Sequence, residues 1–224
     1  MRIAARFQGP PGSANGGVAC GLLATHLDAP GGSAVEVTLR QPPPLDVDLR
    51  VDGGNLYAGD VLIATAVPAA LALAPVGPVD VATARAAAAS YAGLVDHPFP
   101  GCFVCGTGRS DGMGLTPGLV AAETAAAVWV PADADPVMVW AALDCPGGWS
   151  ADVPGRPMVL GRMTAQLDAL PTPGEEHVVV GWVLGREGRK TRTGTALYDG
   201  AGALLALATA VWFTVDPATA GLPS

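Results

Sequence analysis

The chain carries the same pattern of residues twice, and this repeat constrains the fold more than any other feature of the sequence. The segments LYAGDVLIATAV (56–67) and LYDGAGALLALATAV (197–211) share a Leu-Tyr pair, a glycine-containing turn and a final Ala-Thr-Ala-Val. Each predicts two β-strands joined by a tight turn, because aromatic and β-branched residues flank a glycine break. Before them, VEVTLRQPPP (35–44) and MTAQLDALPTP (163–173) alternate as strands do and stop at prolines, which cannot donate to a β-ladder. We therefore expect two tandem copies of one unit.

A pair of adjacent glycines precedes each copy, in ANGGVA (14–19) and CPGGWS (145–150). Both pairs lie in apolar runs that predict helices, GGVACGLLATHL (16–27) and PVMVWAALDCPGGWSAD (136–152), and we expect the glycines at both helix starts. The first run has no polar face, so the strands of each unit are expected to wrap around its helix. One helix against a mainly antiparallel sheet is an α+β design.

The repeat also sets the expected domain boundaries. The N-terminal unit spans residues 1–74, with a short opening strand around IAARFQ (3–8). Residues 75–112 form a proline-bounded linker that contains a short helix and a Cys-x2-Cys turn. The C-terminal unit spans residues 113–224 and opens with a strand in LVAAETAAAVWVPA (119–132).

Composition narrows the function classes. Hydrophobic residues make up 50% of the chain, which is enough for a sizeable core, and the net charge of −8 argues against binding to nucleic acid or to anionic membranes. No apolar run approaches the roughly 18 residues of a membrane span, and the N-terminal segment does not resemble a secretory signal. Four cysteines do not make the dense pattern of a secreted disulfide scaffold. We therefore expect a cytoplasmic protein.

Asn15-Gly16-Gly17 is the first candidate site. Helix N-terminal amides have no partners within the helix, and the helix dipole adds partial positive charge there. A carbonyl docked against the amide of Gly16 or Gly17 would be polarised, and a developing oxyanion would be stabilised. The structural alternative is an asparagine cap followed by glycines that allow close packing of the helix.

Asp144 is the second candidate, because it is a lone acid in the apolar run VWAALDCPGGW (139–149). A buried carboxyl group without partners is costly, so Asp144 is expected to be hydrogen-bonded, to face a cleft, or to have a raised pKa. As a general base it would activate water. The alternative is a capping role for the segment that begins at Pro146.

Cys102 and Cys105 have the Cys-x2-Cys spacing of a zinc knuckle, but the sequence has no second such pair. A four-ligand site would also need His97 and Cys145, the latter from a remote segment. Redox chemistry and simple buried thiols remain open, and we expect no metal. The basic hairpin GREGRKTR (185–192) would suit phosphates, although solvated charges at a hairpin tip are the alternative.

The order of these elements, with Gly-Gly at a buried helix, resembles the hotdog fold of acyl-CoA thioesterases, in which an antiparallel sheet wraps a central helix. A chain with two copies resembles a double hotdog. NGG (15–17) is similar to the His/Asn-Gly-Gly element of small hotdog thioesterases. WAALDCPGG (140–148) is similar to the helix segment that carries an aspartate in double-hotdog acyl-CoA thioesterases, and HPFPGCFVCG (97–106) to a segment of uncharacterised actinobacterial double-hotdog proteins.

The resemblance implies a thioesterase-like protein that binds acyl-CoA and hydrolyses the acyl-thioester without a cofactor, with Asp144 and Asn15 as catalytic residues. It places at the substrate a set of residues from both units, namely Gly16, Gly17, Gly147, Gly148 and Thr164. Thr164 and Gln166 offer the Ser/Thr and Gln types that support the aspartate in double-hotdog enzymes.

Two departures keep a second interpretation open. The small thioesterases carry an acid about nine residues beyond the glycines, where this chain has Ala24, and the last strand, LLALATAVWFTV (204–215), lacks glutamine. Both favour a non-catalytic acyl-CoA-binding or scaffold protein of the same fold. Pairing into a homodimer stays open under either interpretation.

Overall fold

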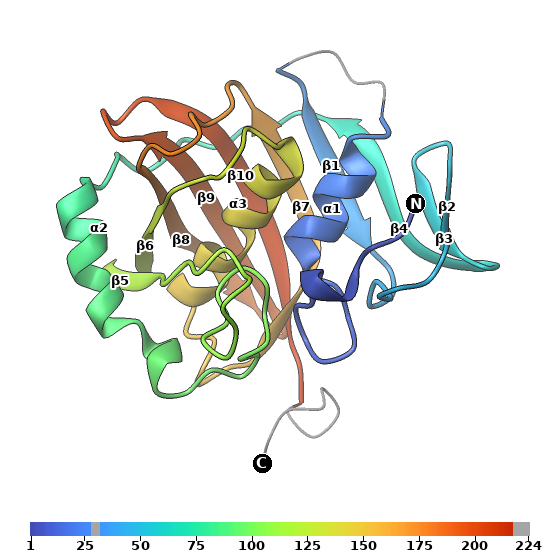
Figure 1. Ribbon diagram of the computed structural model, residues 1–224, viewed down its shortest axis with the longest axis horizontal. Coiled ribbons are helices and arrows are strands. Elements are labelled where there is room, and N and C mark those ends of the chain that lie inside the picture. The colour runs from blue at the N-terminus through green and yellow to red at the C-terminus, as the bar shows by residue number, and fades with distance from the viewer. Residues whose placement is uncertain (28–31, 217–224) are drawn as a thin grey trace.

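The computed structural model describes residues 1–27 and 32–216, and the strands within them form one ten-stranded antiparallel sheet (Figure 1). From one edge to the other the order is β2-β3-β4-β1-β7-β10-β9-β8-β6-β5. The strands are β1 (Ala34–Leu39), β2 (Leu49–Asp52), β3 (Asn55–Ala58), β4 (Val61–Ala69), β5 (Gly118–Ala121), β6 (Thr124–Trp129), β7 (Met158–Leu167), β8 (His177–Glu187), β9 (Lys190–Asp199) and β10 (Leu204–Thr214).

The two halves of the chain meet where β1 pairs with β7, with Val37 opposite Met163. Outward from this seam, β4 and β3 on one side correspond to β10 and β9 on the other. The hairpins β3-β4 and β9-β10 are formed by the two repeated segments, 56–67 and 197–211. The repeat and the α+β fold class are therefore confirmed. The boundaries after residues 74 and 112 stay a prediction.

Two helices lie side by side against one face of the sheet (Figure 1). They are α1 (Gly16–Ala24), with Asn15 as its N-cap, and α3 (Pro136–Ser150), with Asp135 as its N-cap. Both are buried for most of their length, and for α1 the absence of a polar face predicts this. The short helical segments elsewhere are α2 (Val81–Ala87) and the 3-10 turns Ala5–Phe7, Ala88–Ser90 and Ala92–Leu94.

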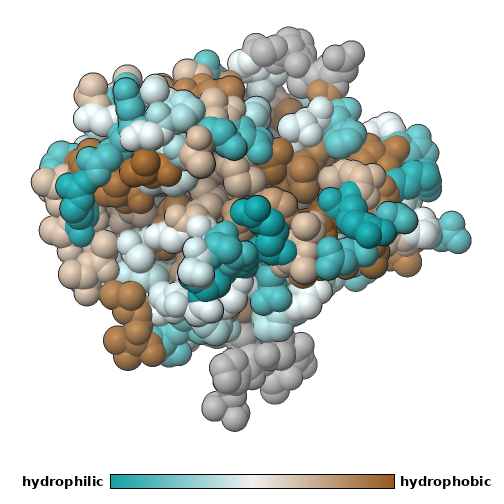
Figure 2. Space-filling model, in the orientation of Figure 1, coloured by the Kyte–Doolittle hydropathy of each residue, from teal (hydrophilic) through white to brown (hydrophobic). Residues whose placement is uncertain are grey.

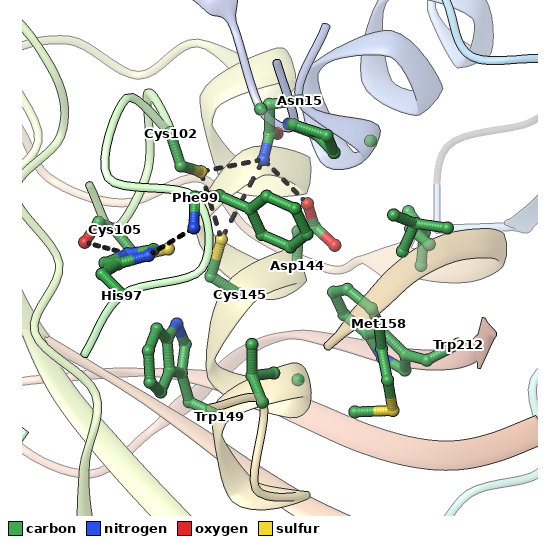
Figure 3. Close-up of a pocket in the computed structure, with 17 residues that line it drawn as sticks. Asn15, His97, Phe99, Cys102, Cys105, Asp144, Cys145, Trp149, Met158 and Trp212 are labelled. Carbon is green, nitrogen blue, oxygen red and sulfur yellow. Dashed lines mark hydrogen bonds between the residues drawn. The ribbon is translucent and has the colours of Figure 1, made fainter. Parts of the chain in front are cut away.

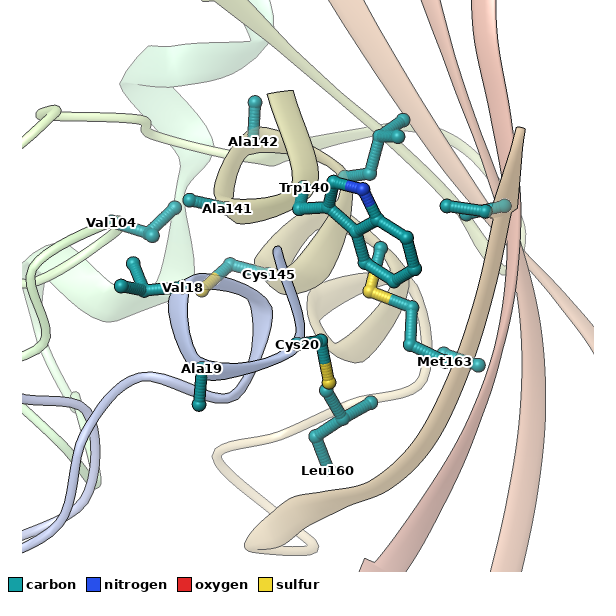
Figure 4. Close-up of a cluster of buried hydrophobic side chains, with 14 of the residues drawn as sticks. Val18, Ala19, Cys20, Val104, Trp140, Ala141, Ala142, Cys145, Leu160 and Met163 are labelled. Atoms are coloured by element: carbon teal, nitrogen blue, oxygen red, sulfur yellow. The ribbon is translucent and has the colours of Figure 1, made fainter. Parts of the chain in front are cut away.

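The two helices run antiparallel, and glycines let their backbones approach closely. A Cβ on Gly17 would lie 2.6 Å from the carbonyl oxygen of Trp140, and one on Gly21 would lie 3.1 Å from the Cα of Val137. A step of one turn forward along α1, from Gly17 to Gly21, moves the contact about one turn backward along α3, from Trp140 to Val137. Figure 4 shows Trp140 of α3 beside Met163 of the sheet, Cys20 of α1 near Leu160, and Val18 on the side of α1 toward Val104.

The opposite face of the second half is covered by α2 and the chain before it. Alternate residues of β8 point to the two faces: Val179 belongs to the cluster around α3, whereas Val178 and Val180 pack with Ala84 of α2. On the face shown in Figure 2, hydrophilic and hydrophobic residues are intermingled. None of the described helices has both the length and the hydropathy to cross a membrane.

Three local predictions were wrong. The opening strand expected at 3–8 is a 3-10 turn with a single bridge from Gln8 to Ala14. The segment 119–132 does not form one strand but contributes to the hairpin β5-β6. Gly147 and Gly148 lie in the last turn of α3 and not at its start, because the apolar run before them is already helical from Pro136.

Candidate functional site

Asn15 joins the two halves of the molecule. Its Oδ1 accepts a hydrogen bond from the Val18 amide at 2.9 Å, which is the N-cap that the structural alternative predicted. Its Nδ2 donates to Oδ2 of Asp144 at 2.9 Å, and the Gly17 amide donates to the same oxygen at 3.0 Å. A carboxyl group from the second half therefore sits on the N-terminus of a helix from the first half, where the helix dipole favours negative charge.

Asp144 is buried within α3, with 2% of its surface exposed. Burial raises the pKa of its carboxyl to about 7, against the opposing effect of the hydrogen bond from the Gly17 amide. Its second oxygen, Oδ1, has no hydrogen-bond partner among the described residues. A buried carboxyl oxygen without a partner is costly, and such an atom is suited to accept a hydrogen bond from a bound molecule.

Gly16 is the first residue of α1, so its amide has no partner within the helix. The Gly17 amide is engaged by Asp144, which leaves Gly16 as the donor of the pair that can face a ligand. A Cβ on Gly16 would lie 2.7 Å from Cδ2 of Leu160. Glycine at this position therefore keeps the helix N-terminus close to β7.

A small pocket of about 50 Å³ lies beside these groups (Figure 3). Asn15, Gly16, His97 and Asp144 line it, together with the three cysteines Cys102, Cys105 and Cys145. Most of the remaining wall is apolar, and its large side chains are Phe99, Trp149, Met158, Leu160 and Trp212. The pocket thus combines a carboxyl group, a helix N-terminus and an apolar surface.

A larger groove of about 570 Å³ adjoins the pocket, and Gly16 and Leu160 line both. The groove contains two basic side chains, Arg40 after β1 and Arg189 at the tip of the β8-β9 hairpin. Of the predicted basic hairpin, Arg189 therefore lines a hollow, whereas Arg186 pairs with Glu123. Gly16 lies where the apolar pocket meets the basic groove.

Three buried cysteines gather near Asn15 and line the same pocket. The sulfurs of Cys102, Cys105 and Cys145 all lie within 4.8 Å of one another, and Cys102 and Cys145 are 3.9 Å apart. Hydrogen bonds from the thiols of Cys105 and Cys145 hold the pKa of Cys102 below its ordinary value. Cys145 directly follows Asp144, so this remote residue does meet the Cys-x2-Cys turn.

His97 holds the segment that carries this turn. Its Nε2 hydrogen-bonds the Cys105 carbonyl at 3.0 Å, and its Nδ1 accepts from the Phe99 amide at 3.0 Å. Burial lowers the pKa of His97, which favours the neutral ring that these two contacts need. Tyr91 donates a second hydrogen bond to the Cys105 carbonyl at 2.9 Å.

The other predicted substrate residues are not gathered in one place. Gly148 lines the pocket, whereas Gly147 packs against β9, where a Cβ would lie 2.6 Å from Oγ1 of Thr193. Thr164 lies on β7 beside Glu36 and does not line the pocket. Gln166 donates to Asp168 instead of supporting Asp144.

Sequence reasoning missed the aromatic wall of the pocket. Phe99, Trp149 and Trp212 come from three distant segments, and no local spacing links them. The one available signal was Trp149 beside the glycine pair, since a large aromatic residue next to glycines at the end of an apolar helix marks a packed boundary.

Comparison with known proteins supports the fold and leaves the activity open. The sequence matches no protein-family model and no curated protein. Its structure is similar to a candidate thioesterase II from Thermobifida fusca (TM-score 0.63, 13% identity, 96% of this chain and 91% of that one). A candidate thioesterase from Novosphingobium aromaticivorans is equally similar (TM-score 0.63, 14% identity, 96% and 94%).

A third solved structure comes from Alicyclobacillus acidocaldarius and is described as a conserved protein of unknown function with a hotdog fold (TM-score 0.59, 14% identity, 96% and 92%). At these identities the similarity is one of fold, and it extends over nearly the whole length of each chain. This chain therefore has the double-hotdog fold.

Proposed function

We propose that this protein binds acyl-CoA and hydrolyses its thioester, with Asp144 as the general base. One observation carries the proposal. Asp144, from the second half, rests on the N-terminus of α1, from the first half; its buried Oδ1 has no partner among the described residues, and Asp144 lines a pocket. A base and an oxyanion-binding amide beside one pocket are the two elements that acyl transfer to water requires.

In this mechanism the thioester carbonyl lies against the Gly16 amide. A water molecule hydrogen-bonded to Oδ1 of Asp144 attacks the carbonyl carbon, and its proton passes to the carboxylate. The oxyanion that forms is stabilised by the Gly16 amide and the α1 dipole. Collapse of the tetrahedral intermediate breaks the carbon–sulfur bond, and the departing thiolate takes up the proton from Asp144. Asn15 keeps the carboxyl group oriented through its Nδ2 bond.

The hollows on either side of Gly16 suit the two ends of such a substrate. The groove carries Arg40 and Arg189, which complement the phosphates of coenzyme A. The pocket is walled by Phe99, Trp149 and Trp212, which complement an acyl chain. The proposal therefore places the thioester at the junction, with its acyl side toward Asp144. A cytoplasmic location and a homodimer stay predictions.

Hydrolysis of a series of acyl-CoA thioesters of different chain length tests the proposal. Asp144→Asn keeps the shape of the side chain but removes the base, so we expect kcat/KM to fall by about 10²- to 10⁴-fold. Asp168→Asn, the same change at an exposed aspartate just after the end of β7, is the matched control. Equal hydrolysis by Asp144→Asn and by the wild type would contradict the role of Asp144.

A second function, binding of acyl-CoA without hydrolysis, is favoured by the tight burial of Asp144. Its Oδ2 occupies the α1 N-terminus, and the pocket beside it holds only about 50 Å³. Under this alternative, isothermal titration would show wild type and Asp144→Asn binding acyl-CoA equally well. No thioester of the series would then be hydrolysed above the buffer rate.

A further inference from the structure

The proposed hydrolysis uses Asp144, Asn15 and Gly16 and gives no role to the three buried cysteines beside them. Their sulfurs face one another across two segments, the turn after Phe99 and helix α3. We propose that Cys102, Cys105 and Cys145 bind one zinc ion, or a chemically similar thiophilic divalent cation. Such an ion would fasten the linker segment 97–106 to the central helix of the second half.

The spacing of the sulfurs fits a tetrahedral site. With zinc–sulfur bonds of about 2.3 Å, neighbouring sulfurs of a tetrahedron lie about 3.8 Å apart. Cys102 and Cys145 are 3.9 Å apart, and all three sulfurs lie within 4.8 Å of one another. A disulfide would need about 2.05 Å between sulfurs, so the three cysteines are not bonded to one another, and their spacing leaves room for an ion between them.

The backbone of the Cys-x2-Cys turn has the form that presents sulfurs to a metal. The Gly106 amide donates to the Cys102 carbonyl at 2.8 Å, which closes the turn. A Cβ on Gly106 would lie 2.4 Å from that same carbonyl oxygen. The sequence Cys-x2-Cys-Gly therefore allows a turn so tight that both thiols point the same way.

A side-chain donor, the amide of Asn15, lies near the sulfurs as well. Nδ2 of Asn15 lies 3.8 Å from the sulfur of Cys102 and 4.0 Å from that of Cys145. Three neutral thiols need few donors, whereas three thiolates around a divalent ion leave one net negative charge for N–H groups to offset.

His97 is not the fourth ligand, because its two ring nitrogens contact the Cys105 carbonyl and the Phe99 amide. Within residues 1–27 and 32–216, the group of metal-ligating atoms contains only the three sulfurs. All three cysteines line the pocket. The fourth position therefore faces the pocket, where water or a small anion would complete the tetrahedron, as in zinc sites that keep an open position.

Cobalt binding to the whole chain tests the site without any assay of hydrolysis. Protein purified under reducing conditions and stripped with a chelator is titrated with Co²⁺ alone, and then with Zn²⁺. We expect one equivalent of Co²⁺, with the intense thiolate-to-cobalt charge-transfer band and the visible bands of a tetrahedral site, and displacement by one equivalent of Zn²⁺. Cys102→Ser and Cys145→Ser should each lose that spectrum.

Cys20→Ser is the matched control, because Cys20 is a buried free thiol outside the cluster. It should keep the cobalt spectrum. If the cluster variants fail to fold, the wild-type titration decides. A wild type that binds no Co²⁺, or that binds it without thiolate bands, would overturn the proposal. Unchanged binding by folded Cys102→Ser and Cys145→Ser would overturn it too. None of these outcomes depends on whether the protein hydrolyses thioesters.

Discussion

At the scale of single residues, Asn15 has two separate tasks on one side chain. Oδ1 caps α1 by accepting from Val18, and Nδ2 donates to Asp144 across the boundary between the halves. A local pattern predicts the cap, because asparagine before a helix is a common N-cap. The bond to Asp144 could not be predicted in the same way, since it depends on how two segments 129 positions apart come together.

The two tasks of Asn15 can be separated by substitution. Asn15→Ala removes both and is expected to lower the free energy of unfolding by about 1 kcal/mol through the lost cap alone. Asn15→Ser keeps a capping oxygen but has no amide to donate to Asp144, so it should be more stable than Asn15→Ala. Urea unfolding measures the first effect, and acyl-CoA hydrolysis measures the second.

Both variants are expected to lose hydrolysis to a similar extent, because both remove the Nδ2 bond that orients the carboxyl group. Full activity in Asn15→Ser would show that this bond is dispensable and that Asn15 is only a cap.

At the scale of elements, the two adjacent glycines at the start of α1 each allow the close approach of a different neighbour. Gly16 faces Leu160 of the sheet, and Gly17 faces the backbone of α3. The sequence correctly indicated that something approaches the backbone there. It did not show that a second helix is the close neighbour of Gly17, because helix periodicity does not reveal which elements a helix contacts. It also misplaced Gly147 and Gly148 at a helix start, because α3 is already helical from Pro136.

Gly17→Ala tests the contact between α1 and α3. The new Cβ would lie 2.6 Å from the Trp140 carbonyl oxygen and 2.7 Å from the Cβ of Asp144, so the helices must move apart. We expect a loss of about 1–3 kcal/mol in the free energy of unfolding, despite the higher helix propensity of alanine. Gly77→Ala, where nothing lies within 4 Å, is the control and should unfold like the wild type. Equal stability of the two variants would contradict the close approach.

At the scale of the whole molecule, one sheet runs through both halves, and the candidate site depends on both. The repeated hairpins predicted two copies of one unit, since period-two patterns and prolines at strand ends survive in each copy; that β1 and β7 join the copies into one sheet is seen only in the structure. The site itself could be predicted only in part. Asn15 and Asp144 were singled out as unusual in their local segments, whereas the aromatic wall and the cysteine cluster arise from packing between distant segments.

The continuity of the sheet predicts that the halves unfold together. Met163 of β7 is fully buried opposite Val37 of β1, so Met163→Ala should cost about 2–5 kcal/mol while leaving a single transition. Circular dichroism during urea unfolding, followed alongside tryptophan fluorescence, measures both properties. Leu119→Ala, at a side chain that is 56% exposed, should change little. Two separate transitions would show that the seam does not couple the halves.

The most direct measurement of the central claim is a crystal structure with a stable ketone analogue of acyl-CoA, in which a methylene separates the sulfur from the carbonyl carbon. We predict that the ketone oxygen lies within hydrogen-bond distance of the Gly16 amide and that Oδ1 of Asp144 faces the carbonyl carbon. The coenzyme should lie along the groove that contains Arg40 and Arg189. An analogue bound away from Gly16 and Asp144 would contradict the claim that the two halves together form an acyl-thioester site.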